Sequence, residues 1–258
     1  MTCGCMTARI SQAPISDKVL RFIESDELEA LGPQEILTWG IKNFGASLAL
    51  SCSFGAPEGL ALLDMMHRID PRSRVFVIDT GRLPQETHAL IDRVRERYGK
   101  DVEVIFPRTQ DVQDLVRAKG MNSFYDSVES RQRCCRVRKV EPLNDYLAGL
   151  QGWVTGLRRD QNVTRSHTPK IEVDHLHGGI LKFNPIADWS REQVMEYVEA
   201  RGVPINRLHA EGYPSVGCAP CSRPVRVGED ARAGRWWWEN AETRECGIHV
   251  GEEEGSGI

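Results

Sequence analysis

The stretch SLALSCSFGAPE, residues 47–58, indicates how this chain folds. Its first five residues are a short apolar run typical of a buried strand, and a helical pattern of apolar residues continues from Leu60 to Ile69. The loop between them could hold an anion, because backbone N–H groups point outward at the start of a helix. A Ser- and Gly-containing loop is also common where nothing binds. The candidate contacts in this loop are Ser51, Ser53, Phe54 and Gly55.

Strands and helices alternate on the C-terminal side of this stretch. Strand patterns occupy residues 74–78, 102–106 and 152–156, and a helical pattern occupies residues 84–98. Such alternation forms right-handed βαβ units around a parallel sheet. Residues 170–186 are typical of a hairpin. The sequence therefore predicts a single α/β domain with a Rossmann-like parallel sheet.

Helices are also predicted on both sides of this unit. Apolar residues recur at helical spacing over residues 17–31 and 33–44, and Ser190 with Gln193 forms a capping box before a helix that ends at Arg201. The acidic, glycine-rich end of the chain is expected to be a mobile tail. The predicted divisions are an N-terminal helical segment packed on the core (1–46), an α/β nucleotide- and cluster-binding domain (47–235) and a C-terminal segment (236–258).

The overall charge argues against general binding to nucleic acid. The chain has 258 residues, 40% of them hydrophobic, and a formal charge of −4, which gives no general attraction to nucleic acid. Basic residues nevertheless gather at 131–139 and at 158–165, which indicates a local anionic ligand, although solvated surface arginines would look the same.

The chain is expected to be cytoplasmic. No apolar run approaches the roughly 20 residues that span a bilayer, and the first residues lack a secretory pattern. Eight cysteines without such a signal fit a reducing compartment. Cys3 and Cys5 are interpreted as incidental, because no second pair is left for them.

Four cysteines form the strongest chemical signal. Cys134 and Cys135 are adjacent, and Cys218 and Cys221 form a C-x-x-C motif. Zinc sites usually space paired thiols by two to four residues, whereas adjacent side chains diverge and could reach two irons of a larger cluster. One 4Fe–4S cluster therefore fits better than zinc, and free or redox-active thiols are the third alternative.

These motifs resemble those of assimilatory adenylyl-sulfate reductases, the iron–sulfur branch of the adenylyl-sulfate and phosphoadenylyl-sulfate reductases. The resemblance rests on the Cys134-Cys135 pair followed by Arg-x-Arg-Lys, on the later C-x-x-C and on the segment from Glu245 to His249. It covers the chain from about Ser47 and implies a fold like that of the adenine-nucleotide α-hydrolases. The stricter Ser-Gly-Gly-x-Asp-Ser loop of ATP pyrophosphatases is absent, which counts against ATP cleavage.

The resemblance assigns substrate contacts. It places the turn after the second strand beside the adenosine, and it places the basic loop after the fourth strand at the phosphosulfate, where the forked donors of arginine suit an oxyanion. Arg165 is the favoured contact, and basic positions near three consecutive tryptophans correspond to a later segment of the family. The residues concerned are Thr80, Gly81, Leu83, Gly156, Arg158, Arg165, Arg232 and Arg235.

Three further residues receive roles. On a helix starting near Cys135, Lys139 would lie on the same face and could separate the charges of a cluster and an anionic substrate. The resemblance makes Cys246 the nucleophile, and a protonated His249 would favour its thiolate.

The function implied is thioredoxin-dependent reduction of adenylyl sulfate to sulfite and AMP, through an S-sulfocysteine on Cys246. Thioredoxin and the small-molecule substrate are the expected partners, with no nucleic acid and no membrane, and a homo-oligomer is compatible with the sequence. The alternatives are a 3′-phosphoadenylyl-sulfate reductase, a cluster-dependent ATP-activating RNA thiolase and a non-catalytic cluster-based redox sensor.

Overall fold

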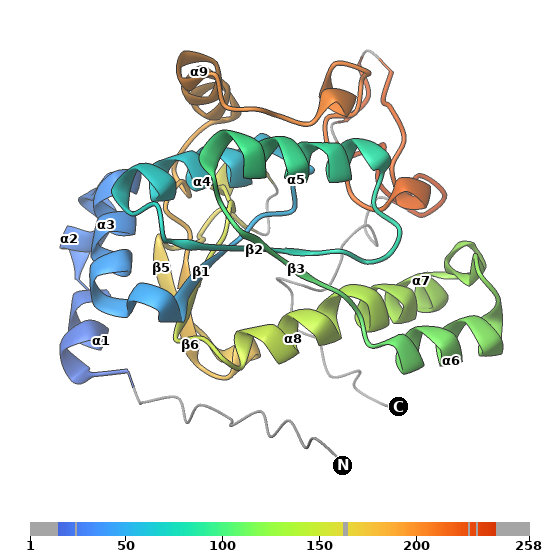
Figure 1. Cartoon of the computed structure of the whole chain (residues 1–258), viewed down its shortest axis with the longest axis horizontal. Helices are drawn as coiled ribbons and strands as arrows, with labels where there is room; N and C mark the ends of the chain where they lie inside the picture. Colours follow the sequence, from blue (N-terminus) through green and yellow to red (C-terminus); the bar gives the residue numbers. More distant parts are fainter. Residues whose placement is uncertain (1–14, 24, 162–164, 227, 231, 241–258) are drawn as a thin grey trace.

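The computed structural model describes residues 15–23, 25–161, 165–226, 228–230 and 232–240 (Figure 1). A six-stranded sheet lies at its centre, in the order β3-β2-β1-β4-β6-β5. The strands are β1 (Leu48–Ser51), β2 (Arg74–Ile78), β3 (Val102–Ile105), β4 (Gly152–Val154), β5 (Ile171–Asp174) and β6 (Ile180–Phe183). All neighbouring pairs are parallel except β5 with β6. The predicted α/β class, the parallel sheet and the hairpin are confirmed.

Helices pack on both faces of the sheet. They are α1 (Asp17–Ile23), α2 (Asp26–Ala30), α3 (Pro33–Phe44), α4 (Pro57–Ile69), α5 (Gln85–Tyr98), α6 (Thr109–Lys119), α7 (Val128–Cys135), α8 (Glu141–Leu147) and α9 (Arg191–Arg201). In Figure 1, α4 and α5 lie on one side of the strands and α8 on the other. No helix in the described part of the chain is long and apolar enough to cross a membrane.

The alternation of side chains along each strand separates two cores. Leu48 and Leu50 of β1 join the larger core with α3, α4, α5 and α9, whereas Ala49 faces the smaller core with α8. Phe76 and Trp153 continue the smaller core on β2 and β4. Both faces are apolar because helices cover both, which is why these strands read as continuous apolar runs.

The helical predictions are partly confirmed. The capping box at Ser190 is present, with its hydroxyl accepting from the Gln193 N–H at 3.3 Å. The single helix predicted over residues 17–31 is wrong, because α1 and α2 are separate. The Ser25 hydroxyl donates to the Phe22 carbonyl at 2.7 Å, a local bond that competes with a continuous helix.

The helix predicted to start near Cys135 is also wrong, because α7 begins at Val128 and ends at Cys135. A five-residue π-helical segment, η3 (Arg136–Val140), follows it and leads into α8. Pro142, in the first turn of α8, has no N–H to donate back to Arg138. π-helical insertions often accompany functional sites in helices, and here the insertion directly follows two candidate ligands.

Candidate functional site

The loop after β1 is held from several sides. Phe54 is fully buried with a left-handed φ of 55°, and its carbonyl accepts from Asn206 Nδ2 at 3.0 Å. The Gly55 carbonyl accepts from the Val216 N–H at 3.2 Å. The Ser53 side chain is exposed at the rim of the loop, and its hydroxyl accepts from the Gly55 N–H at 3.3 Å. The loop backbone is therefore fixed, with Ser53 facing solvent and Ser51 half-buried at the strand end.

Cys52 lies in the same loop but is a structural residue. Its side chain is 1% exposed, and burial raises the pKa of its thiol to about 12. A thiol that stays protonated at neutral pH is a poor nucleophile.

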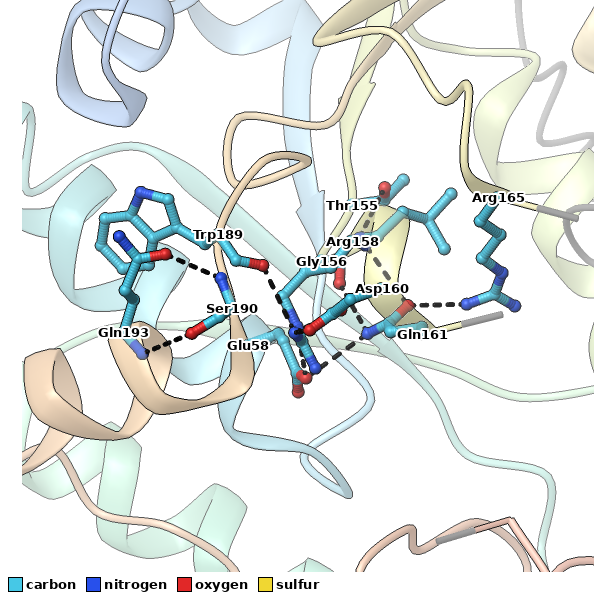
Figure 2. Close-up of polar contacts among 11 residues, drawn as sticks. Glu58, Thr155, Gly156, Arg158, Asp160, Gln161, Arg165, Trp189, Ser190 and Gln193 are labelled. Atoms are coloured by element: carbon cyan, nitrogen blue, oxygen red, sulfur yellow. Dashed lines mark hydrogen bonds and ion pairs between the residues drawn. The ribbon is translucent and has the colours of Figure 1, made fainter. Parts of the chain in front are cut away.

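The loop after β4 is joined to the first turn of α4 by a buried ion pair (Figure 2). Arg158 is 4% exposed and Glu58 is 5% exposed, and Arg158 Nε donates to Glu58 Oε1 at 3.1 Å. Arg158 Nη1 also donates to the Asp160 carboxylate and to the Trp189 carbonyl oxygen. The structure thus places Arg158, a predicted substrate contact, inside a set of internal partners.

Two more predicted contacts adjoin this ion pair. A Cβ added at Gly156 would lie 2.8 Å from the Glu58 Cβ, so only glycine lets this loop approach the first turn of α4 this closely. Arg165 is half-buried, and its Nη1 donates to Gln161 Oε1 at 2.7 Å. Gln161 Nε2 in turn lies 3.4 Å from Glu58 Oε1. Glu58 therefore connects to both arginines, directly to one and through an amide to the other (Figure 2).

The turn after β2 lies at a different place. Thr80 is 1% exposed, and its Oγ1 lies 3.2 Å from Cys218 Sγ. The Gly81 N–H donates to Asp79 Oδ1 at 2.8 Å, and Leu83 packs against the larger core. The Arg82 carbonyl accepts from the Ala219 N–H at 2.8 Å. This turn therefore contacts the C-x-x-C segment directly.

All four predicted cluster cysteines line one cavity. It encloses about 350 Å³, including space open to solvent. The sequence brings them together from the C-terminal end of α7 and from the short helix η8 (Ala219–Cys221) and its N-cap. They are unpaired thiols. The cavity is lined by Thr80, Arg82, Phe124, Arg131, Cys134, Cys135, Arg138, Lys139, Cys218, Pro220 and Cys221.

Burial and charge oppose each other at these thiols. Burial and the neighbouring thiols of Cys218 and Cys135 together raise the pKa of Cys221 to about 12, while the Arg235 guanidinium acts in the opposite direction. Burial also raises the pKa of Cys134, while the nearby Arg138 guanidinium acts in the opposite direction. Thiols of this kind become thiolates when a metal replaces their protons.

The donor set fits an iron–sulfur cluster. Four thiols on one cavity are the ligands that such clusters take. Across the residues that the structure describes, no three His, Cys, Asp or Glu side chains converge closely enough to hold a single metal ion.

Lys139, in the π-helical segment η3, lies on the wall of the same cavity. Arg138 is buried, and its Nη1 donates to the Thr80 carbonyl oxygen at 2.8 Å. Arg138 therefore links this segment to the turn after β2, and Lys139 places a cation at the thiol cavity.

A buried ion pair joins α7 to the tryptophan segment. Arg131 is 1% exposed and donates to Glu239 through Nε and Nη2 at 2.9 and 2.8 Å. Its guanidinium carbon lies 4.9 Å from the centre of the Trp236 ring, which is 2% exposed. The first tryptophan is thus mainly a packing residue, in an apolar cluster with Phe124 and Cys221.

Arg235 lies against the C-x-x-C segment. Its Nε donates to the Cys221 carbonyl at 3.2 Å, and its guanidinium carbon is 4.6 Å from the Trp236 ring centre. A Cβ at Gly217 would lie 2.3 Å from Arg235 Nη2, so the guanidinium packs on bare backbone. Arg232, by contrast, is half-buried in the preceding turn, where its N–H donates to Asp230 Oδ1 at 2.7 Å.

The predicted residues thus fall into two groups among the described positions, one around Glu58 and one around the thiols. Cys246, His249 and the predicted mobile tail lie outside the described residues. Arg131, Glu239 and Gln161 were not among the predicted site residues. Helical spacing could have indicated Arg131, which lies four residues before Cys135, but Glu239 has no signal in the sequence.

Comparison with known proteins finds similarity to reductases of nucleotide phosphosulfates. Residues 47–224 match the phosphoadenosine phosphosulfate reductase domain. An adenosine 5′-phosphosulfate reductase from Allochromatium vinosum is 50% identical over 203 residues, which cover 79% of this chain and 78% of that protein.

Solved structures agree on the fold. A phosphoadenylyl-sulfate reductase from Candida auris, in a phosphate complex, is 27% identical with a TM-score of 0.68, covering 83% of this chain and 100% of that one. An FMN adenylyltransferase from Candida glabrata shares the fold alone, at 14% identity and a TM-score of 0.51, with coverage of 91% and 78%. The predicted resemblance in fold to enzymes that act on adenine nucleotides is confirmed.

The close packing at Gly55 generates a prediction. A Cβ there would lie 2.2 Å from the Val216 carbonyl oxygen, which is backbone and cannot rotate away. We expect Gly55→Ala to lower the free energy of unfolding by about 1–3 kcal/mol, measured by urea denaturation. Gly149→Ala is the matched control, because its Cβ would be 3.6 Å from its nearest neighbour, and it should change stability by about 0.5 kcal/mol or less. Equal stability of the two variants would contradict the packing argument.

Proposed function

The chain belongs to the phosphoadenosine phosphosulfate reductase family, and we propose that it reduces adenylyl sulfate, which is adenosine 5′-phosphosulfate, to sulfite and AMP. The observation that carries this proposal is the cavity lined by four thiols and Lys139, beside the turn after β2. An enzyme that needed only the nucleotide loops would have no use for four thiols in one cavity. The curated relative at 50% identity bears the name of this activity, which favours reduction over ATP-dependent thiolation of RNA.

Cys134, Cys135, Cys218 and Cys221 are the proposed ligands of one 4Fe–4S cluster. When bound, the cluster supplies a structural link between α7 and η8 and a centre of negative charge. The surrounding cations balance this charge, since Arg131, Arg138 and Lys139 all reach the cavity wall. The electrons for the reaction are assigned to a dithiol, so this role of the cluster requires no change of its redox state.

The proposed nucleophile is the Cys246 thiolate. It attacks the sulfur of adenylyl sulfate, the bond from that sulfur to the phosphate oxygen breaks, and AMP leaves with the electron pair. The product on the protein is an S-sulfocysteine. Arg165, Arg232, Arg235 and Lys139 are the proposed cations that stabilise charge on the sulfonate and on the departing phosphate.

Thioredoxin is the proposed reductant. One of its thiolates attacks Cys246 Sγ, which releases sulfite and leaves a mixed disulfide between the two proteins. Its second thiol then attacks the thioredoxin sulfur of that disulfide, so Cys246 returns as a thiolate and thioredoxin leaves oxidised. The two electrons that reduce the sulfur thus come from the dithiol, which fits the reducing cytoplasm that we propose as the compartment.

The nucleotide preference follows from the charges near the adenosine loops. A 3′-phosphate adds nearly two negative charges and requires cations of its own. Arg82 is the basic residue of the two loops assigned to the nucleotide, and its Nη1 and Nη2 donate to Asn122 and Met121. The argument that Glu58 would repel a 3′-phosphate is weakened, because Glu58 is paired with Arg158. The commitment of Arg82 is the stronger reason to propose the unphosphorylated substrate.

The first prediction from the proposed function concerns the cluster. Serine in place of any one of the four cysteines should lower bound iron from about four per chain and lower activity with it. Iron and sulfide analysis of anaerobically purified protein, together with the visible absorption spectrum, measures this. Cys52→Ser is the control, because that thiol is buried outside the cavity. Full iron content in a Cys135→Ser protein would remove Cys135 from the ligand set.

The second prediction concerns the nucleophile. Cys246→Ser should lower kcat by about a thousandfold or more while bound iron is retained, because a hydroxyl is a poor nucleophile at neutral pH. Substrate labelled in its sulfonate should label the unmutated protein at Cys246, and thioredoxin should remove the label. Label on another cysteine would refute the assignment.

The third prediction tests the substrate. With thioredoxin as reductant, kcat/KM for adenylyl sulfate should exceed that for its 3′-phosphorylated form by at least about tenfold, equivalent to ~1.4 kcal/mol. Steady-state kinetics with both nucleotides measures the ratio. The reverse preference would assign the chain to the phosphoadenylyl-sulfate branch.

A further inference from the structure

The hydrogen-bond network around Glu58 includes Gln161, a neutral side chain that lies between Glu58 and Arg165. We infer that Gln161 is a positioning residue that orients Arg165 toward the anionic end of the substrate, and that Arg158 is an internal strut that does not contact the substrate. The inference rests on the proposed function, because it takes the phosphosulfate to be the anion that Arg165 meets.

The network lies where a ligand is expected in a sheet of this type. β1 pairs with β2 on one side and with β4 on the other, so the chain leaves β1 and β4 in opposite directions along the sheet. In open parallel sheets, ligands bind in the crevice at such a reversal, beyond the carboxyl ends of the strands. Glu58 follows β1 and Gln161 follows β4, and Figure 2 shows their side chains in contact with each other.

Arg158 is committed to internal partners. It is 4% exposed and binds the Glu58 carboxylate, the Asp160 carboxylate and the Trp189 carbonyl oxygen. Moving it onto a substrate would leave the carboxylate of Glu58 buried without its counter-charge, which is strongly unfavourable. Its role is therefore to hold Glu58 and, through Trp189, the segment before α9.

The orientation of the Gln161 amide follows from its four neighbours. Its Nε2 faces two acceptors, Glu58 Oε1 and the Gly156 carbonyl, each at 3.4 Å. Its Oε1 faces two donors, Arg165 Nη1 at 2.7 Å and the Arg158 N–H at 3.3 Å. A flipped amide would set donors against donors and acceptors against acceptors. The oxygen that holds Arg165 is thus oriented by Glu58, which is itself held by Arg158.

A neutral amide suits this task better than a carboxylate. The charges of Arg158 and Arg165 balance those of Glu58 and Asp160, so glutamine leaves the group neutral. A glutamate at position 161 would keep an acceptor for Arg165 but would make the group negative and face the carboxylate of Glu58. It would repel an incoming phosphosulfate while keeping the hydrogen bond. Hydrogen bonding and charge can therefore be separated by experiment.

The test is a double-mutant cycle in the full-length protein with bound cluster. Gln161→Met removes the hydrogen bonds with little change of volume, and Arg165→Ala removes the residue that it orients. We expect Gln161→Met alone to lower kcat/KM for adenylyl sulfate by about tenfold, and to have less than about a twofold effect in the Arg165→Ala background. Gln161→Glu should be worse than Gln161→Met, by about a further tenfold.

Controls separate this inference from the proposed function. Thermal unfolding of each variant should match that of the unmutated protein, since a general loss of structure would move the melting temperature as well as the kinetics. Equal effects of Gln161→Met in both backgrounds, or a Gln161→Glu protein as active as the unmutated one, would overturn the inference while reduction of adenylyl sulfate stands. An unmutated protein that neither binds nor reduces adenylyl sulfate would overturn the proposed function itself.

Discussion

The buried ion pair between Glu58 and Arg158 is the constraint on which the nucleotide side of the site depends. It forms because β1 and β4 are parallel neighbours, so their following loops emerge at the same edge of the sheet. Breaking such a pair by removing one partner costs about 3–5 kcal/mol, because the other charge stays buried. Gly156 permits the approach, and Gln161 extends the network to Arg165. An arginine that a sequence pattern assigns to the substrate can thus be required by the fold instead.

The sheet could be predicted because each of its strands and connecting helices has a recognisable pattern within a short stretch of sequence. Each strand covered on both faces is a short apolar run, and the connections have the composition of helices. The chain from residue 106 to residue 152 is harder to predict, because α6 and α7 each have one buried residue, Leu115 and Arg131. The π-helical segment after Cys135 depends on how α7 and α8 meet at Pro142, which no window of the sequence reports on alone.

At the cysteine cavity, the ligand residues could be predicted from the sequence, whereas the packing around them could not. The pairing of an adjacent Cys-Cys with a C-x-x-C could be anticipated from ligand chemistry, and the four thiols do share a cavity. The packing of Arg131 between Glu239 and Trp236 could not, because residues 131 and 239 are brought together only by the tertiary fold. A sequence motif can indicate what a site binds. The buried ion pairs that support the site join residues far apart in the chain, so they produce no local sequence pattern.

The two halves of the site are connected through the backbone of one segment. Val216 donates to Gly55 in the loop after β1, and Ala219 donates to Arg82 in the turn after β2. Between these bonds, Cys218 lies against the Thr80 hydroxyl. A displacement of the C-x-x-C segment must therefore shift both loops, since Gly55 packs directly on the Val216 carbonyl. A group bound by the four thiols that fixes the position of the C-x-x-C segment would therefore also fix the conformation of the loop after β1 and of the turn after β2. Because coupling between two sites is reciprocal, a nucleotide that binds this conformation more tightly must raise the affinity of the thiols for that group by the same factor.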